Sequence, residues 1–511
     1  MEVSTNNIPV LVALVALMGI SLLIGLLPSK KASKGFLSFM IADKALPWWA
    51  IAGSCFATYA GTTCFLGWIG NSGKIGISAA WQFALHATSF LMLGLFFVPI
   101  LVRMKRVTLA EPLGERFGSD LRRISSFFSF ARLIGSTASQ IVGIGVLISM
   151  FSTLDLRAAC ILSAIVLILY VSIGGMYGVA YADTMQGLIM LLFIVVAPIV
   201  LLAIIGNGSM AAGFSQVIAS LPEKNLNMST AGTNKIIGWV LVMSVANLLR
   251  PELYGRIFSA RSPKEGVRTW VVVTSMVIVM MIVILILGMI CTYAVPNFEG
   301  TNDQYGPAMF IAIAPQWLTI LYVLGIMGAA VSTASSAMLG CSSHYITDFH
   351  LPIFYKNAQP SQKTMVVLSR IAVIVFTLIA LWWALAWKDI ITIFQFGYTV
   401  LVAGILMPYI GMFFWPRMTS AAAKWSAILG GGTALLWQFV LKPSGILPSG
   451  TFIAGLDASV PALILSVSSA IIITYMTAPE YDKVLKFAET YKLTKMIRWA
   501  QDGLAEKKSA Q

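Results

Sequence analysis

Charged residues are scarce in this sequence. Of 511 residues only 11% are charged while 58% are hydrophobic, and the mean hydropathy is +0.86. An ordinary globular protein carries roughly 25% charged residues. A set of soluble domains with charged surfaces is therefore excluded, and most of the surface must face something other than water.

Cysteine and histidine are also few, with five and three residues respectively. The cysteines fall within or at the ends of apolar runs, without the pairs that a zinc site needs. Disulfides and structural zinc are not expected. The polar segments are too short for a separate enzyme domain, and no catalytic triad or phosphate-binding loop stands at membrane depth, so we do not expect an enzyme. The five cysteines are Cys55, Cys64, Cys160, Cys291 and Cys341.

What the sequence has instead is one long apolar run after another. About 20 helical residues cross the core of a bilayer, and the runs are close to this length. The sequence therefore predicts an all-α, polytopic membrane protein with about thirteen transmembrane helices. The runs are 9–27, 47–70, 77–102, 124–151, 158–173, 185–205, 236–249, 270–295, 317–339, 364–387, 390–415, 425–441 and 460–475.

The net charge of +14 is distributed unevenly over the loops. Alternate loops, counted from the N-terminus, carry 26 Lys and Arg residues on one side and 6 on the other. Because basic loops stay in the cytoplasm, the N-terminus is expected outside and the C-terminus inside, in a multi-pass protein of the plasma (inner) membrane. The net positive charge is thus explained by membrane topology and by contact with lipid, and a nucleic-acid partner is not expected.

Two of the runs are interrupted. Residues 57–63 form a small, polar, poorly helical stretch inside the second run, and five runs later Pro251 follows Asn247 and Arg250 inside the seventh. Proline removes a backbone donor, and charges at membrane depth are costly. Interrupted helices at matching positions predict a five-plus-five inverted repeat, with a binding site between them.

This pattern divides the chain into four parts. We expect an extra N-terminal helix and cytoplasmic loop (1–46), the inverted-repeat core (47–418), two accessory transmembrane helices (419–477) and a cytoplasmic tail (478–511). Within the tail, residues 483–499 alternate apolar and basic side chains. This is typical of one amphipathic helix lying at the membrane surface.

The ninth run carries a face of small and hydroxyl-bearing residues. Ala329, Ser332, Thr333 and Ser336 are spaced i, i+3, i+4 and i+7, so they share one helix face. Hydroxyls and the carbonyls of an unwound helix are ligands for a hard cation such as sodium. The same residues are also typical of close helix packing, which remains open.

Asp183 follows a glycine-rich segment at the predicted start of the sixth span. A carboxylate at that depth must be paired, hydrated or bound to a cation. Capping of the helix start is the alternative.

On these residues the sequence resembles the sodium:solute symporter family, whose members carry proline, pantothenate, sugars, sialic acid and choline on a leucine-transporter-like inverted-repeat core. The resemblance extends from the second run to about residue 415. The matching segments are 57–67, 108–112 with 116–118, 174–186, Pro251 with Arg256 and Ala260, 329–348, and 404–415.

The resemblance implies sodium ligands at named positions. The family's common sodium site would use main-chain carbonyls of Ala57, Ala60 and Ala329 and the hydroxyls of Ser332 and Thr333. A further site, present in some members, would use Asp183, Ser332, Ser335 and Ser336. One sodium ion is therefore expected, and a second is possible by resemblance. Coupling to protons instead stays open.

The resemblance also implies a solute pocket at mid-membrane, lined by Cys64, Phe83, His86, Asn247 and Gln395. Arg132 resembles the position that holds the carboxylate in the sialic acid carrier, and an arginine can bind such a group through two hydrogen bonds. A structural ion pair is the alternative.

Arg250 departs from the family pattern. It is a further candidate for contact with the solute, and simple neutralisation by Glu252 is the alternative. For His86, a role as donor to the solute and simple packing both stay open. A small carboxylate or amino acid is favoured over a quaternary amine, which arginine would repel.

The sequence thus predicts a sodium-coupled symporter that imports a small organic solute by alternating access. A solute sensor on the same fold, with a separate signalling partner, is the alternative. Neither the solute nor the oligomeric state follows from the sequence.

Overall fold

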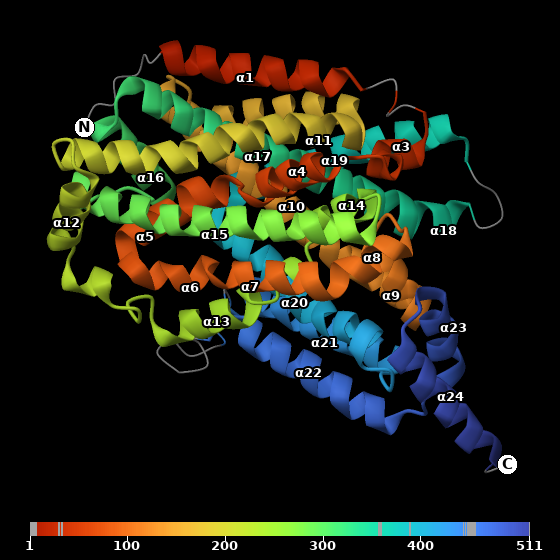
Figure 1. Cartoon of the computed structure of the whole chain (residues 1–511). Coiled ribbons are helices and arrows are strands. Elements are labelled where there is room, and N and C mark those ends of the chain that lie inside the picture. The colour runs from red at the N-terminus through yellow and green to blue at the C-terminus, as the bar shows by residue number, and fades with distance from the viewer. Residues whose placement is uncertain are drawn as a thin grey trace.

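A computed structural model describes residues 8–28, 31, 34–355, 360–387, 390–442, 444, 446 and 456–509. In this part of the chain helices account for nearly all regular structure, and no strand is present. They run alongside one another as a bundle (Figure 1). Within these residues, ten helical stretches are long and apolar enough to cross a membrane. The predicted all-α, polytopic class is confirmed.

The first half of the bundle contains the N-terminal helix and five further crossings. Their helices are α1 (Ile8–Leu26), α4 (Trp48–Tyr59), η2 (Thr63–Trp68), α5 (Ile69–Ile75), η3 (Gly76–Ala79), α6 (Ala80–Phe83), α7 (Leu85–Met92), η4 (Leu93–Phe97), α8 (Val98–Met104), α10 (Ser119–Phe151) and α11 (Leu156–Ile205).

The second half repeats the arrangement and adds two helices. Its members are α13 (Thr233–Met243), η6 (Ala246–Leu248), α14 (Pro251–Ser259), α15 (Pro263–Ala294), α17 (Gln316–His344), η7 (Tyr345–His350), α19 (Gln362–Trp387), α20 (Ile390–Phe414), α21 (Ser420–Leu436), η8 (Trp437–Leu441) and α22 (Ser459–Met476).

Short helices gather at the two ends of the bundle (Figure 1). One end has α12 (Met210–Ser220), η5 (Glu223–Leu226) and α16 (Asn302–Ile313), and the other has α3 (Phe36–Ile41), η1 (Ala42–Lys44), α9 (Ala110–Phe117), α18 (Leu351–Phe354), α23 (Tyr481–Tyr491) and α24 (Thr494–Ser509).

The predicted crossings that do not stand out as long helices are interrupted or short. The second is split between α4, η2 and α5, the fifth is the first part of α11, and the twelfth is α21 with η8. An interruption shortens each helical segment, but the segments together still form the predicted crossing.

The helix α11 differs from the predicted pattern. Its 50 residues comprise two helical crossings, which meet at Gly175, where the backbone is not helical (φ 53°). Residues 176–184, which we expected before the span, are helical. Asp183 therefore lies eight positions beyond the kink, and the alternative that it caps a helix start is wrong.

The predicted single amphipathic helix at 483–499 is also wrong. The chain turns at Lys492 (φ 57°), which lies in the left-handed region. α23 and α24 pack together as a hairpin through Val484, Ala488, Met496 and Ala500. The apolar face is thus covered within the tail itself. Residues 1–7, which we expect on the outer side, lie outside the described residues.

Candidate functional site

The first broken helix releases two main-chain carbonyls. α4 ends at Tyr59, and the Gly61 N–H, which would bond to Ala57 O in a continued helix, donates to Tyr59 O at 2.9 Å. Likewise the Cys64 N–H donates to Gly61 O at 3.0 Å instead of Ala60 O. The carbonyls of Ala57 and Ala60 thereby lose their helical donors. These are the two positions at which the resemblance places sodium ligands.

The ninth crossing faces this break. The Thr333 hydroxyl donates to Thr58 O at 2.9 Å, and the Thr58 hydroxyl lies 3.0 Å from the Ser336 hydroxyl and 3.4 Å from that of Ser332. All of these side chains are buried, as is Ala329. The structure therefore brings together α4 and α17, which are about 270 residues apart in the sequence.

The break is held by a side chain that the sequence did not point to. The Gln140 Oε1 of α10 accepts a hydrogen bond from Thr62 N at 2.8 Å. A Cβ at Gly61 would stand 3.0 Å from both Gln140 Oε1 and Thr333 Oγ1. The glycine thus allows close approach of three helices at one point. Freed carbonyls and hydroxyls assembled in this way form an oxygen-rich, buried set that suits a hard monovalent cation.

The set around Asp183 already contains a cation. The Arg256 Nη2 lies 2.8 Å from Asp183 Oδ2, and Arg256 Nε lies 2.7 Å from the Ser54 hydroxyl. Ser54 in turn donates to Asp183 at 2.7 Å. Arg256 belongs to α14 and is fully buried. We had counted it among the cytoplasmic loop charges, and that assignment is wrong.

Two of the three hydroxyls of this set, those of Ser335 and Ser336, donate within their own helix, while the Ser332 hydroxyl lies 3.4 Å from that of Thr58. Ser335 donates to Ser332 O at 2.9 Å, and Ser336 donates to the same carbonyl at 2.7 Å. Arg256 also donates to the Ser336 hydroxyl. As arranged, the second set does not fit a sodium ion, because a guanidinium occupies the place of the positive charge.

A second buried charge cluster lies nearby. Arg132 Nη2 and Arg250 Nε both bond to Glu252 Oε1, at 2.9 and 2.6 Å. Arg250 Nη2 also donates to Thr58 O at 2.9 Å. Arg132 and Arg250 thus both form an ion pair with Glu252, and contact of either arginine with the solute stays a prediction.

One carboxylate cannot neutralise two guanidinium groups, so the cluster keeps one positive charge. All three side chains have no exposed surface. Within the described residues, Arg132 Nε and Nη1 and Arg250 Nη1 have no hydrogen-bond partner. Buried donors of this kind are costly unless something binds them. The cluster thus holds three unpartnered donors beside one unpartnered carboxylate oxygen, Glu252 Oε2, within the described residues.

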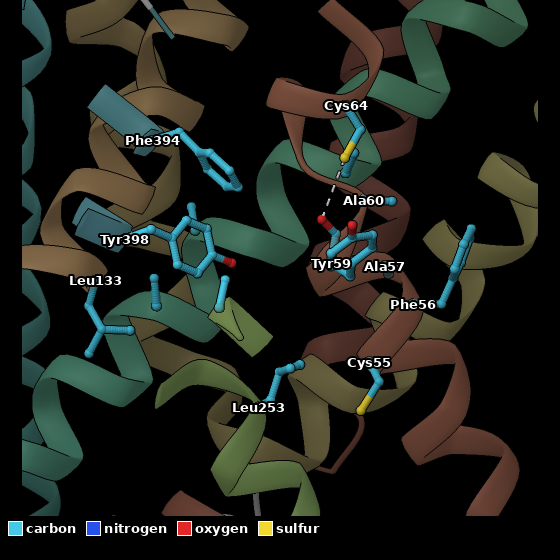
Figure 2. Close-up of a cluster of buried hydrophobic side chains, with 14 of the residues drawn as sticks. Cys55, Phe56, Ala57, Tyr59, Ala60, Cys64, Leu133, Leu253, Phe394 and Tyr398 are labelled. Carbon is cyan, nitrogen blue, oxygen red and sulfur yellow. Dashed lines mark hydrogen bonds between the residues drawn. The ribbon is translucent and has the colours of Figure 1, made fainter. Parts of the chain in front are cut away.

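Aromatic rings surround this charge. The Arg132 guanidinium lies 4.1 Å from the centre of the Tyr398 ring and 5.1 Å from that of Phe394, while Arg250 lies 5.3 Å from Tyr59. Figure 2 shows Phe394 and Tyr398 on one side and Tyr59 and Cys64 on the other, with the Tyr398 hydroxyl pointing toward α4. The hydroxyls of both tyrosines lack hydrogen-bond partners among the described residues.

The residues expected to line the pocket lie on the outer side of these rings. Asn247 Nδ2 lies 3.0 Å from His86 Nδ1 and also donates to Ser89. Phe83 and His86 lie 5.4 and 5.5 Å from Trp68 between ring centres. His86 is therefore held by Asn247 among aromatic rings, and its Nε2 has no partner within the described part of the chain.

Gln395 lies apart from this group, in a cavity of about 330 Å³. The cavity is lined by polar side chains from several helices, including Asn71, Gln82, Gln395 and Lys442. The Cys64 thiol is directed at Tyr59 O, 3.7 Å away, within the protein (Figure 2).

The opposite end of the bundle is closed by charged and hydroxyl groups. Asp348 of η7 lies 2.6 Å from Arg122 Nε and accepts a hydrogen bond from Ser126, also at 2.6 Å. His344 Nδ1 lies 2.9 Å from the same carboxylate. These bonds join the ends of α10 and α17. Two cavities lie near them. One, beside Glu252 and Ser336, has about 20 Å³, and the other, lined by Glu111 and Thr347 among others, has about 500 Å³.

The sequence analysis missed several residues of the site. Five of them contact the predicted ligands and Gln140 bonds to Thr62 at the helix break; the five are Ser54, Thr58, Tyr59, Arg256 and Tyr398. Of these residues, only Arg256 could have been noticed in the sequence, because it is a charged residue six positions after Arg250, beyond Pro251. The others are ordinary polar or aromatic residues, whose role depends on which helices meet.

Comparisons with known proteins agree with this arrangement. A model of the sodium:solute symporter family matches residues 39–430. The sodium/proline symporter of Staphylococcus aureus is 26% identical over 493 residues, covering 92% of each chain. The sodium/pantothenate symporter of Escherichia coli is 26% identical over 445 residues, covering 83% of this chain and 88% of its own.

One solved structure extends the likeness to the fold. The substrate-bound, outward-open state of a sodium-coupled sialic acid symporter superposes with a TM-score of 0.75 at 18% identity, covering 92% of this chain and 98% of the other. At that identity the likeness shows the fold alone.

Proposed function

We propose, from the premise that this chain belongs to the sodium:solute symporter family, that its solute is a small organic carboxylate or amino acid. The chain is a sodium-coupled symporter that imports a small solute across a membrane. It is thus a carrier and not an enzyme, and the relatives named above give no support to a solute sensor. The resemblance stated from the sequence is confirmed.

The proposed sodium ligands are the carbonyls of Ala57, Ala60 and Ala329 with the hydroxyls of Ser332 and Thr333. What supports them is the pair of carbonyls that the break in α4 releases beside the hydroxyl face of α17. Binding an ion between two helices stabilises the arrangement in which they are close. The inward sodium gradient then drives transport, because the ion binds the two access states with different affinity.

The proposed solute site lies between Arg132, Arg250, Tyr59 and Tyr398. The observation that favours a carboxylate is the surplus positive charge with its three unpartnered nitrogen atoms. A carboxylate would neutralise the charge and accept those donors. Asn247 and His86 offer polar atoms for the rest of an amino acid.

The proposed topology places the N-terminus outside and the C-terminus in the cytoplasm of the plasma (inner) membrane. The polar cavity at Gln395 would then open outward, and the Asp348 contacts would close the cytoplasmic side. The four-part division at residues 46, 418 and 477 is proposed on the same basis.

The first test concerns sodium. Ser332→Ala and Thr333→Ala should each raise the sodium concentration for half-maximal uptake about tenfold, equivalent to ~1.4 kcal/mol, because each removes one ligand oxygen. Uptake is measured in proteoliposomes with an imposed sodium gradient. Thr377→Ala is the control, since its hydroxyl bonds only to Val373 O of its own helix. Unchanged sodium dependence in both site variants would refute the sodium site.

The solute is identified by thermal stability. Purified protein is screened against small carboxylates, amino acids and amines, with and without sodium. A true substrate stabilises the protein more when the ion is present, because both bind the folded state. Stabilisation by amines but by no carboxylate or amino acid would contradict the proposed solute class.

A further inference from the structure

The ion pair between Asp183 and Arg256 joins four elements at one point. Arg256 comes from α14, Asp183 from α11, Ser54 from α4 and Ser336 from α17. Arg256 uses each of its three guanidinium nitrogens, with Nη1 donating to Glu252 O at 2.9 Å. Arg132 and Arg250, in contrast, leave donors unpartnered within the described residues. Arg256 is therefore fully committed inside the protein.

The position of the Arg256 guanidinium determines whether a second sodium ion can bind beside Asp183. By resemblance, a second sodium ion would use Asp183 with the hydroxyls of Ser332, Ser335 and Ser336. Two of these four groups, Asp183 and Ser336, bond to Arg256. The Ser335 hydroxyl donates to the main chain. A sodium ion added here would lie within a few ångströms of a fixed positive charge in a medium of low dielectric constant, where like charges repel strongly.

We infer that Arg256 serves as the resident cation of the Asp183 site, so that the chain binds one sodium ion and not two. This inference rests on the proposed function and adds a stoichiometry to it. The sodium ion between α4 and α17 remains the transported one. The Arg256 guanidinium supplies the second positive charge and, because it is part of the protein, is not transported.

The arrangement gives a buried carboxylate a counter-charge without a second ion. Asp183 has no exposed surface, and an unpaired buried carboxylate would be costly. Arg256 provides the counter-charge and two bonds that hold Ser54 and Ser336 in place. Since Ser336 also lies 3.0 Å from Thr58 Oγ1, the same contact supports the helix break at the proposed sodium site.

The test is equilibrium binding of sodium to the purified full-length protein, followed by calorimetry and by radioactive sodium, with choline as the inert cation. The wild type should bind one sodium ion per chain, with a Hill coefficient of about 1. Arg256→Gln should gain a second ion and a Hill coefficient between about 1.5 and 2, because the carboxylate and hydroxyls become available. Arg256→Lys should still bind one ion, since a lysine ammonium keeps the charge.

The double variant Arg256→Gln with Asp183→Asn is the matched control. It leaves no uncompensated charge, and it should return to one sodium ion. Binding of two sodium ions by the wild type would overturn the inference. This measurement does not depend on the folding of any variant. A folded Arg256→Gln protein that still binds one ion would also overturn it. Failure of the proposed function looks different, because a wild type that binds no sodium would remove the transported ion itself.

Discussion

At the scale of residues, three buried arginines have three different environments. Arg256 bonds through every nitrogen, Arg250 keeps one nitrogen unpartnered within the described residues, and Arg132 keeps two. The pairing follows from geometry, because a single oxygen of Glu252 accepts from both Arg132 and Arg250. The unpartnered donors next to two tyrosine rings are the observation on which the proposed solute site rests.

Replacement of Arg132 tests the proposed solute site. Arg132→Gln leaves a balanced Arg250–Glu252 pair, so the protein should fold. It should lower the affinity for the carboxylate selected by the stability screen by about 30- to 100-fold, a loss of ~2–3 kcal/mol. Arg132→Lys should recover only part of the affinity, because an ammonium lacks the planar pair of donors.

The readout is the dissociation constant of the carboxylate and of its amide, measured by thermal shift or calorimetry. The wild type should discriminate acid from amide, and Arg132→Gln should lose that discrimination. Arg123→Gln, at an exposed site on the same helix, is the control. Equal loss of affinity for acid and amide would assign Arg132 a structural role only.

At the scale of elements, the site depends on the contrast between a broken helix and a continuous one. α4 stops at Tyr59 and the second broken crossing stops at η6 before Pro251, whereas α17 runs unbroken from Gln316 to His344. A continuous helix presents hydroxyls at a fixed spacing, and the broken helix presents carbonyls. Together they form an oxygen set that neither forms alone.

Gly61→Ala tests how tightly the break is fitted. The new methyl group would stand 3.0 Å from Gln140 Oε1 and Thr333 Oγ1, closer than van der Waals contact allows. Displacement of Thr333 should raise the half-maximal sodium concentration about tenfold while leaving the protein folded. Sodium-dependent tryptophan fluorescence reports this.

Gly325→Ala is the matched control for that substitution. Gly325 lies on α17, and its added Cβ would meet Phe193 at 3.8 Å, an ordinary contact. It should leave sodium binding unchanged. Similar behaviour of the two alanine variants would mean that crowding at Gly61 does not reach the site.

At the scale of the whole molecule, the tail and the core form one unit at the closed end. The Glu480 carboxylate accepts from Ser420 N at 2.8 Å and so caps α21, while Tyr491 bonds to Glu115 beside Arg106. Large apolar side chains such as Val15 (72% exposed) and Trp382 (71% exposed) face outward along the bundle. Such a surface is compatible with the hydrocarbon core of a bilayer. The tail lies at one end of the bundle, and its polar contacts with the core are found there (Figure 1).

Docking of the tail should depend on pH through Glu480. Burial alone would raise the pKa of Glu480, but hydrogen bonds from Lys483 and Ser420 outweigh burial and hold it below its usual value. Because the pKa of Glu480 is lower in the folded state, its carboxylate stabilises tail docking fully above the unfolded-state pKa of about 4.3. That stabilisation is lost as the pH falls through the folded-state pKa.

Hydrogen exchange of α23 measures this docking. Protection should be constant between about pH 7 and 5, apart from the intrinsic pH effect, and should fall below about pH 4. Glu480→Gln should reduce it already at pH 7, whereas Glu489→Gln, at an exposed position of α23, should not. Protection that survives acidification unchanged would show that apolar packing alone holds the tail.

The sequence by itself determined the class, the approximate crossings and the two broken helices. These depend on local properties, namely apolar length, proline and small residues, which act over one or two turns. The carbonyls of Ala57 and Ala60 and the hydroxyl face of α17 were predictable for the same reason, with the resemblance supplying their common purpose. Each of these features can be stated for one helix at a time.

Only the tertiary structure decided which helices meet. It paired Asp183 with Arg256, placed Gln140 at the break and gave two arginines a single carboxylate. Apart from Arg250 and Glu252, which are neighbours in the sequence, these partners are 73 to 120 positions apart and meet only through the packing of separate helices, so spacing along the chain does not indicate them. The positive charge of the solute site and the arginine in the second cation site follow from that packing.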